Sequence, residues 1–263
     1  MQHIFYHYLV FQSLYSLLDV LIFHAPGVRY SFFMPYSLLW FLFSHFCWKL
    51  LLLIFAKIKH PFIVSVLMGI AVGYAPFIGA WLSFSRTFVF FPFFLAGYYF
   101  RSEMLPTALA AKIKWAGAVG TAALLLFAYV HPIDPKWLYS SFTFRELGFT
   151  AWYAGIYRLG VYVLEVFASL CFLSLVPLRR ATMTEWGNHT VYVFLLHAII
   201  TKTAIATGIF AHIQSPLQIA AVFLMAGLLT WVLLQERIRR LSRPLIEPDL
   251  AFWERWTVSR HRM

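Results

Sequence analysis

Apolar residues fill this chain in long, nearly unbroken windows, and only short polar stretches separate them. An α-helix that crosses a bilayer needs roughly 20 apolar residues, and roughly eight windows reach or approach that length. They cover residues 4–23, 36–56, 61–81, 85–100, 115–130, 159–176, 190–210 and 217–234. The pattern predicts an all-α, polytopic transmembrane helical bundle of about eight spans.

The window at residues 85–100 differs from the others because it is short, aromatic and contains Pro92. It begins with Arg86 between two hydroxyl residues, Ser85 and Thr87. An interrupted segment at membrane depth is tolerated mainly where protein or a cavity surrounds it. We therefore expect a membrane helix that is interrupted at Pro92 and that belongs to a functional site, and not a helix that only anchors the protein.

Composition supports a membrane protein and leaves no room for a soluble domain. Of 263 residues, 62% are hydrophobic and 12% are charged, whereas a soluble domain carries about 25% charged residues. The net charge of +11 is spread between apolar blocks, which argues against a nucleic-acid partner. We expect a membrane domain over residues 1–235 and a basic cytoplasmic tail over residues 236–263.

The distribution of Lys and Arg predicts the orientation of the windows. Eleven cations lie after the second, fourth and sixth windows and at the start of the tail, and five lie in the alternate connections. By the positive-inside rule the first set is cytoplasmic, so both termini are inside and the protein is a multi-pass protein of the plasma membrane. Arg86 and the long connection at residues 131–157 then share the outer side.

Four stretches, taken in order, resemble the integral-membrane acyltransferase family 3, in its fucose 4-O-acetylase-like branch. They are residues 35–42 (PYSLLWFL), 85–98 (SRTFVFFPFFLAGY), 133–139 (IDPKWLY) and 186–197 (WGNHTVYVFLLH). The resemblance implies a helical membrane fold of about ten spans. The chain begins where the third family span is expected, so it is expected to lack the first two spans and the histidine that the family carries there.

The resemblance also implies an activity. It implies transfer of an acyl group, usually acetyl, from a coenzyme A thioester to a sugar hydroxyl of a cell-surface glycan or its lipid-linked precursor. The partners would be the lipid bilayer, the carbohydrate acceptor and acyl-CoA as donor, with no cofactor held permanently. The alternatives are an inactive remnant of the fold and a transporter-like protein that conducts an acyl group or a lipid-linked sugar.

O-acylation needs a base for the acceptor hydroxyl and a donor or cation for the developing oxyanion. His197 and Glu165 lie inside apolar windows, where ionisable groups are functional candidates, and we name them as candidate catalytic residues. His197 could equally be a neutral histidine bonded to a backbone carbonyl. Lys202 is a possible partner of Glu165, while Asp19 and Lys49 are expected to reach toward the interfaces.

Five residues form the predicted substrate-binding set: Arg86, Trp137, Tyr139, Arg158 and Lys202. A guanidinium presents a rigid fork to phosphate or carboxylate, and aromatic rings are able to stack on a sugar. The same residue types also serve as interfacial anchors and aromatic belts. The sequence holds no HExxH, Walker-type loop, GxSxG or paired CxxC motif, so no metal site is predicted.

Overall fold

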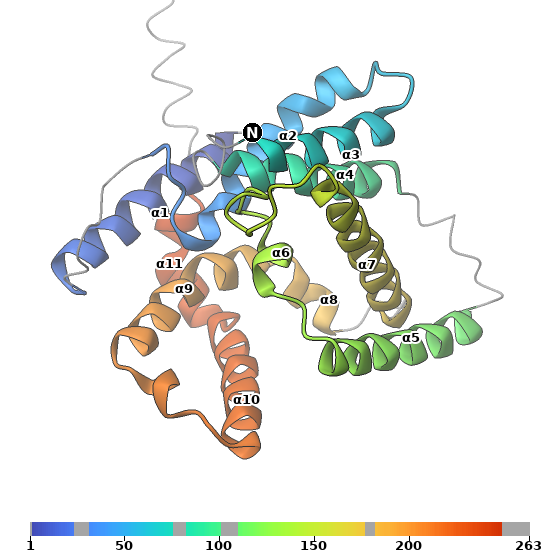
Figure 1. Ribbon diagram of the computed structural model, residues 1–263. Helices are drawn as coiled ribbons and strands as arrows, with labels where there is room; N and C mark the ends of the chain where they lie inside the picture. The colour runs from blue at the N-terminus through green and yellow to red at the C-terminus, as the bar shows by residue number, and fades with distance from the viewer. Residues whose placement is uncertain (1, 24–31, 76–82, 101–109, 177–181, 249–263) are drawn as a thin grey trace, which may run out of the picture. The chain divides into compact units, whose positions relative to one another are not determined.

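A computed structural model describes residues 2–23, 32–75, 83–100, 110–176 and 182–248, and over these residues it is helical without strands (Figure 1). The chain divides into two compact units. The first unit comprises residues 1–16 and 27–178, and the second comprises residues 17–26 and 179–263. The predicted boundary at residue 236 falls inside the second unit.

The helices follow the predicted windows closely. Those that begin before residue 177 are α1 (Gln2–Leu21), α2 (Trp40–Phe55), α3 (Pro61–Ala71), α4 (Phe84–Tyr99), α5 (Ala110–Val130), α6 (Pro135–Tyr139) and α7 (Ala154–Leu175). Those that follow are α8 (Thr182–Gly187), α9 (Thr190–Ala206), α10 (Pro216–Leu233) and α11 (Glu236–Ile246). The all-helical class is therefore confirmed for the described residues.

Four of these helices are long and apolar enough to cross a membrane. The qualifying segments are Ile4–Leu21, Lys112–Val130, Ala154–Leu175 and Pro216–Leu233. The windows predicted at residues 36–56 and 190–210 form shorter apolar helices. The window at residues 61–81 does so as well in its described part, and its residues 76–81 lie outside the described ranges. Length and composition thus support four spanning helices, with shorter apolar helices beside them.

The predicted break at Pro92 is wrong, because α4 runs without interruption from Phe84 to Tyr99. Proline removes one backbone hydrogen bond and crowds the preceding turn. Here the helix is held from several sides: Phe91 and Leu95 are buried with Trp48 and Phe55 of α2. This packing stabilises the turn that the missing hydrogen bond weakens.

Small residues allow the helices of the first unit to approach one another closely. In α3, a Cβ on Gly69 would lie 2.1 Å from the Tyr162 hydroxyl of α7. In α5, a Cβ on Gly117 or Gly120 would collide with Ser174 or Cys171 of α7. Within this unit, α5 packs extensively against α7, and α3 packs extensively against α4 (Figure 1).

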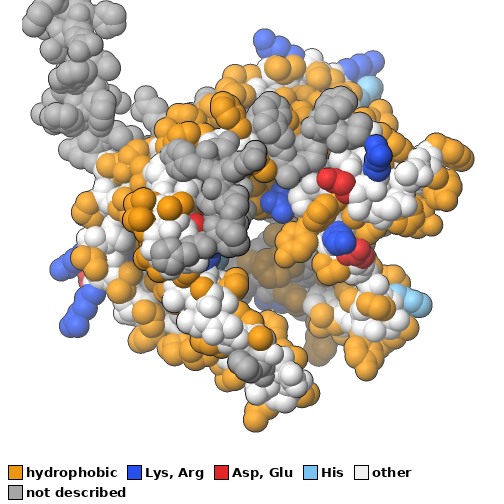
Figure 2. Space-filling view, turned by 60° about the vertical axis from the view of Figure 1, so that its left-hand side comes forward, with side chains coloured by type: hydrophobic (Ala, Val, Ile, Leu, Met, Phe, Trp, Pro, Cys, Tyr) orange, Lys and Arg blue, Asp and Glu red, His pale blue; other side chains and the backbone are white. Residues whose placement is uncertain are grey.

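Hydrophobic side chains also cover much of the exposed surface, as the orange atoms of Figure 2 show. Helix α10 is an extreme case, since only 6% of its apolar window is buried and Leu217 is 81% exposed. A helix that is apolar all round is typical of a core or of a lipid-facing position. Exposure of this kind supports contact with a bilayer.

The segment predicted as a basic tail begins with the regular helix α11. This helix packs against α9 and α10 within the second unit, and Ile246 near its end is fully buried. Its exposed charges are arranged in two pairs four residues apart, Arg240 with Glu236 and Arg243 with Glu247. Residues 249–263 of the predicted tail lie outside the described ranges.

Candidate functional site

Three of the four stretches that carry the family resemblance meet at the Arg86 guanidinium. Arg86 lies in the first turn of α4, and its Nε donates a hydrogen bond of 3.1 Å to the Tyr139 carbonyl of α6. The guanidinium carbon lies 5.0 Å from the centre of the Trp40 ring and 6.0 Å from that of the Tyr139 ring. These distances are in the range of cation–π contacts.

The guanidinium of Arg86 keeps hydrogen-bonding capacity. Among the described residues, its one hydrogen bond is made through Nε, and neither terminal amino group donates to a protein acceptor. The described ion pairs do not include Arg86, so no carboxylate in that part of the chain lies within 4.0 Å of it. Two parallel donors are therefore available to a ligand oxygen.

Local sequence explains why α6 forms beside Arg86. The Asp134 carboxylate accepts a hydrogen bond of 2.9 Å from the Lys136 amide, and Pro135 occupies the first helical position. Both are favourable at a helix N-terminus. The helix ends at Ser140, whose φ of 53° lies in the left-handed region.

The carbonyls at the end of α6 have no partner within this short helix, and other helices supply donors. Arg158 of α7 donates to the Trp137 carbonyl at 2.8 Å, and Arg86 donates to the Tyr139 carbonyl. The Ser85 hydroxyl donates to the Ser140 carbonyl at 2.7 Å. Side chains of α4 and α7 thus fix the position of α6 through its backbone.

Arg158 is enclosed by protein, with only 1% of its surface exposed. Besides the Trp137 carbonyl it binds the Ser140 hydroxyl at 2.9 Å, and its guanidinium carbon lies 5.3 Å from the Trp137 ring centre. Its Nε is buried and has no hydrogen-bond partner in the part of the chain that the structure describes. This placement suits a residue that positions the α6 segment better than one that contacts a sugar directly.

The two aromatic residues of the predicted binding set differ in their environments. Trp137 is 8% exposed and lies among aromatic rings, with its centre 5.8 Å from that of Phe144 and 5.3 Å from that of Phe149. Tyr139 is 60% exposed and faces Arg86. Tyr139 is therefore the better placed of the two to contact a ligand held by Arg86.

Glu165 lies on α7 of the same unit, two turns beyond Arg158. Its Oε2 is buried and has no hydrogen-bond partner among the described residues. Tyr162, between these two residues, donates its hydroxyl to the Val89 carbonyl at 2.9 Å. An arginine, a tyrosine and a glutamate thus follow one face of α7, at spacings of four and three residues.

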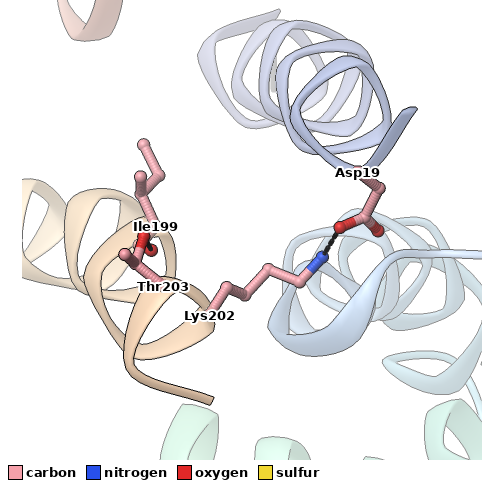
Figure 3. A network of polar contacts seen from close by, with 4 residues as sticks. All are labelled: Asp19, Ile199, Lys202 and Thr203. Atoms are coloured by element: carbon pink, nitrogen blue, oxygen red, sulfur yellow. Dashed lines mark hydrogen bonds and ion pairs between the residues drawn. The ribbon is translucent and has the colours of Figure 1, made fainter. Parts of the chain in front are cut away.

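The expected pairing of Lys202 with Glu165 is not found, because Lys202 forms an ion pair with Asp19 (Figure 3). Both residues belong to the second unit. Asp19 is only 3% exposed, so the expectation that it reaches toward an interface is wrong. The Lys202 amine also lies 5.6 Å from the centre of the Phe23 ring.

His197 of α9 lies in the second unit and is half-buried. Its Nδ1 lies 2.8 Å from the Val193 carbonyl, one turn earlier in the same helix. With Nδ1 protonated, that bond leaves Nε2 as the basic nitrogen. The backbone contact matches the structural interpretation of His197, and it is also compatible with a base.

A buried hydroxyl network beside Arg86 was not predicted as part of the site. The Thr87 and Ser44 hydroxyls lie 2.7 Å apart, and the Trp48 indole donates to the Thr87 carbonyl at 2.6 Å. This network joins α4 to α2 one residue after Arg86. The hydroxyl residues on both sides of Arg86 in the sequence were the available signal, because a buried hydroxyl needs a partner.

Across the described ranges, no three His, Cys, Asp or Glu side chains gather in a way that could hold a metal ion. Comparison of the chain with family models, curated proteins and solved structures finds no match to any of them.

Proposed function

We propose that this protein is an integral-membrane O-acyltransferase, which moves an acyl group from a coenzyme A thioester to a sugar hydroxyl of a cell-surface glycan or a lipid-linked precursor. The observation that carries the proposal is the convergence at Arg86. Trp40, Arg86 and Tyr139 come from three separate stretches that resemble the family, and they are in contact around one guanidinium.

A membrane location is supported by four helices of sufficient length and hydropathy, and by the exposed apolar surface of α10. We infer several spans in the plasma membrane, with both termini cytoplasmic because the cations are distributed unequally. In that orientation the N-terminal end of α4, with Arg86, and the segment that contains α6 lie near the outer surface.

The proposed reaction assigns a role to each candidate residue. The acceptor hydroxyl oxygen attacks the thioester carbonyl carbon, the carbon–sulfur bond breaks, and the hydroxyl proton ends on the coenzyme A sulfur. Arg86 offers its terminal amino groups to the oxyanion or to an anionic group of the substrate. Glu165, in the same unit as Arg86, is the candidate that accepts the proton, and His197 of the other unit is a candidate base on the sequence pattern alone.

Replacing Arg86 with alanine in an assay of glycan O-acylation tests this proposal. Loss of one preorganised oxyanion donor costs on the order of a hundredfold in turnover, so Arg86→Ala should lose most of the activity and Arg86→Lys should retain a part. Arg145→Ala is the matched control, because this arginine is exposed in the connection between α6 and α7. Equal activity of Arg86→Ala and Arg145→Ala would contradict the assignment.

The two alternatives make different predictions in the same assay. An inactive remnant acylates no glycan, with or without Arg86. A conducting protein also fails to acylate, but moves a labelled acyl group or lipid-linked sugar across a vesicle membrane that contains it. Acylation that disappears in His197→Ala or Glu165→Ala at normal protein level would identify the base.

A further inference from the structure

A pocket of about 650 Å³ lies in the first unit between the end of α5, the α6 segment and α7. This volume is in the range of small-molecule sites. Its walls are apolar and aromatic, apart from one charged side chain, Asp134. Arg86 is not among the residues that line this pocket.

Aromatic rings form one wall of the pocket and support one another. The centre of the Phe149 ring lies 5.3 Å from that of Trp137 and 5.2 Å from that of Tyr157. The backbone of Trp137 is fixed in turn by the buried Arg158. One contact that fixes α6, the hydrogen bond from Arg158 to the Trp137 carbonyl, therefore also supports this wall.

Gly160 of α7 lines the pocket and keeps it open. A Cβ built on this glycine meets no atom within 4 Å, so a larger side chain would extend into open space rather than into protein. Glycine is a poor helix former in the middle of a helix. Gly160 therefore offers a way to fill the pocket with little disturbance of its walls.

The chemistry of the lining selects the ligand. An apolar wall favours a hydrocarbon, and the Asp134 carboxylate disfavours an anionic group in the pocket. A free fatty acid would place its own carboxylate near Asp134, whereas the chain of a thioester or ester is neutral. An acetyl group is too small to use a pocket of this volume.

We infer that this pocket takes the hydrocarbon chain of an acyl group longer than acetyl, so that the donor class is a medium-chain acyl-CoA. The inference rests on the proposed acyl transfer, and it names the substrate of the same site. The α6 segment takes part in both places, because Asp134 and Trp137 line the pocket and Tyr139 contacts Arg86.

The inference is tested by measuring acyl transfer in three proteins: the wild type, Gly160→Leu and Gly97→Leu. Each is supplied in turn with acetyl-, butanoyl-, octanoyl- and palmitoyl-CoA. Each buried methylene contributes a factor of about four, so the wild type should favour octanoyl over acetyl strongly. Gly160→Leu should lower the octanoyl-to-acetyl ratio by about tenfold, because its side chain occupies the space of several methylenes. Gly97→Leu, on α4 and equally open, should leave the ratio unchanged.

A binding readout separates failure of this inference from failure of the proposed function. The probe is methyl dodecanoate with a terminal diazirine, photolysed with the protein in lipid nanodiscs, and labelled peptides are mapped by mass spectrometry. Labels are expected on residues 133–137 and 156–164, and they should fall about tenfold in Gly160→Leu but not in Gly97→Leu.

The outcomes of the two experiments differ. Labelling that is unchanged in Gly160→Leu, or transfer that favours acetyl in the wild type, overturns the chain pocket even if acyl transfer itself is observed. Pocket labelling without transfer from any acyl-CoA supports the chain pocket and overturns the proposed reaction.

Discussion

In the first unit a buried arginine and a half-buried arginine are bound by neutral oxygens, whereas in the second unit a buried carboxylate faces a cation. Arg158 binds a carbonyl and a hydroxyl, and Arg86 binds a carbonyl. The ion pairs found in the described residues all lie in the second unit: Lys202 with Asp19, Arg240 with Glu236 and Arg243 with Glu247. The arginines of the first unit are thus bound by uncharged acceptors, whereas cations of the second unit are paired with carboxylates.

The difference shows what each arrangement is able to fix. A carbonyl is part of the backbone, so an arginine that binds it positions a chain segment, here α6 and the rings beside it. An ion pair joins two side chains, here from the last turn of α1 and from α9 (Figure 3). Removing the arginine should loosen a chain segment, whereas removing the lysine should leave a buried carboxylate without the cation that faces it. Substitutions of Arg158 and Lys202 test these two consequences.

The largest effect is expected from Lys202→Met, which removes the cation that faces Asp19. Breaking a buried ion pair on one side costs about 3–5 kcal/mol, because the buried carboxylate loses the cation that faces it. The double variant Asp19→Asn with Lys202→Met should recover most of that loss. Thermal unfolding in nanodiscs of fixed lipid composition measures both.

Arg240→Met is the control for this experiment, since its ion pair with Glu236 is 77% and 65% exposed. An exposed pair contributes under about 0.5–1 kcal/mol, so this variant should unfold close to the wild type. If Lys202→Met were as mild as Arg240→Met, the Asp19 pair would contribute no more than a surface pair.

The second-largest loss of stability is expected from Arg158→Met. This variant tests whether the position of α6 depends on the arginine that binds its carbonyl. Two hydrogen bonds from a charged donor are lost, and together they contribute about 3 kcal/mol. The loss should also loosen α6, so limited proteolysis between residues 131 and 153 should accelerate. Arg158→Lys should restore only a part, because an ammonium lacks the planar guanidinium that lies beside the Trp137 ring.

Arg145→Met is the matched control for Arg158→Met, because Arg145 is exposed in the connection that follows α6. It should change neither the unfolding midpoint nor the cleavage rate. Cleavage of Arg158→Met at the wild-type rate would mean that other contacts hold α6, and the contrast between the two units would be weaker than we infer.

The smallest effect is expected from Tyr162→Phe, which removes a single neutral hydrogen bond to the Val89 carbonyl. Such a bond contributes about 1 kcal/mol, and the ring stays in the cluster with Val72 and Val89. Tyr129→Phe, on the exposed surface of α5, should be neutral. Equal unfolding midpoints for the two variants would show that the Tyr162 hydroxyl does not help to hold α7 against α4.

Hydrophobic patterning predicted most helix positions, because a long apolar run in this composition has few other stable conformations. The windows at residues 159–176 and 217–234 agree with α7 and α10 within a few residues. Patterning failed at Pro92, where packing against α2 outweighs the local preference of proline. Patterning also did not indicate that the predicted tail begins with a regular helix, α11, in which Ile246 is buried.

The site was predicted less completely than the fold. Arg86, Tyr139 and Arg158 were all named from the sequence, and the structure brings them to one short helix. Their acceptors were not predictable, because backbone carbonyls at the end of α6 carry no signature in residue identity. The Asp19 partner of Lys202 was missed for a related reason, since 183 residues separate them and no local pattern connects the two.

Sequence alone determined the helical class of this protein, through long apolar windows and few charged residues. Those properties follow from the residues of each segment by itself, and they do not depend on which helices pack against one another. Tertiary structure alone decided that Trp40, Arg86 and Tyr139 share one guanidinium, and that Asp19 is buried against Lys202. These contacts depend on helix packing, which joins residues far apart in the chain through shape and hydrogen-bond geometry.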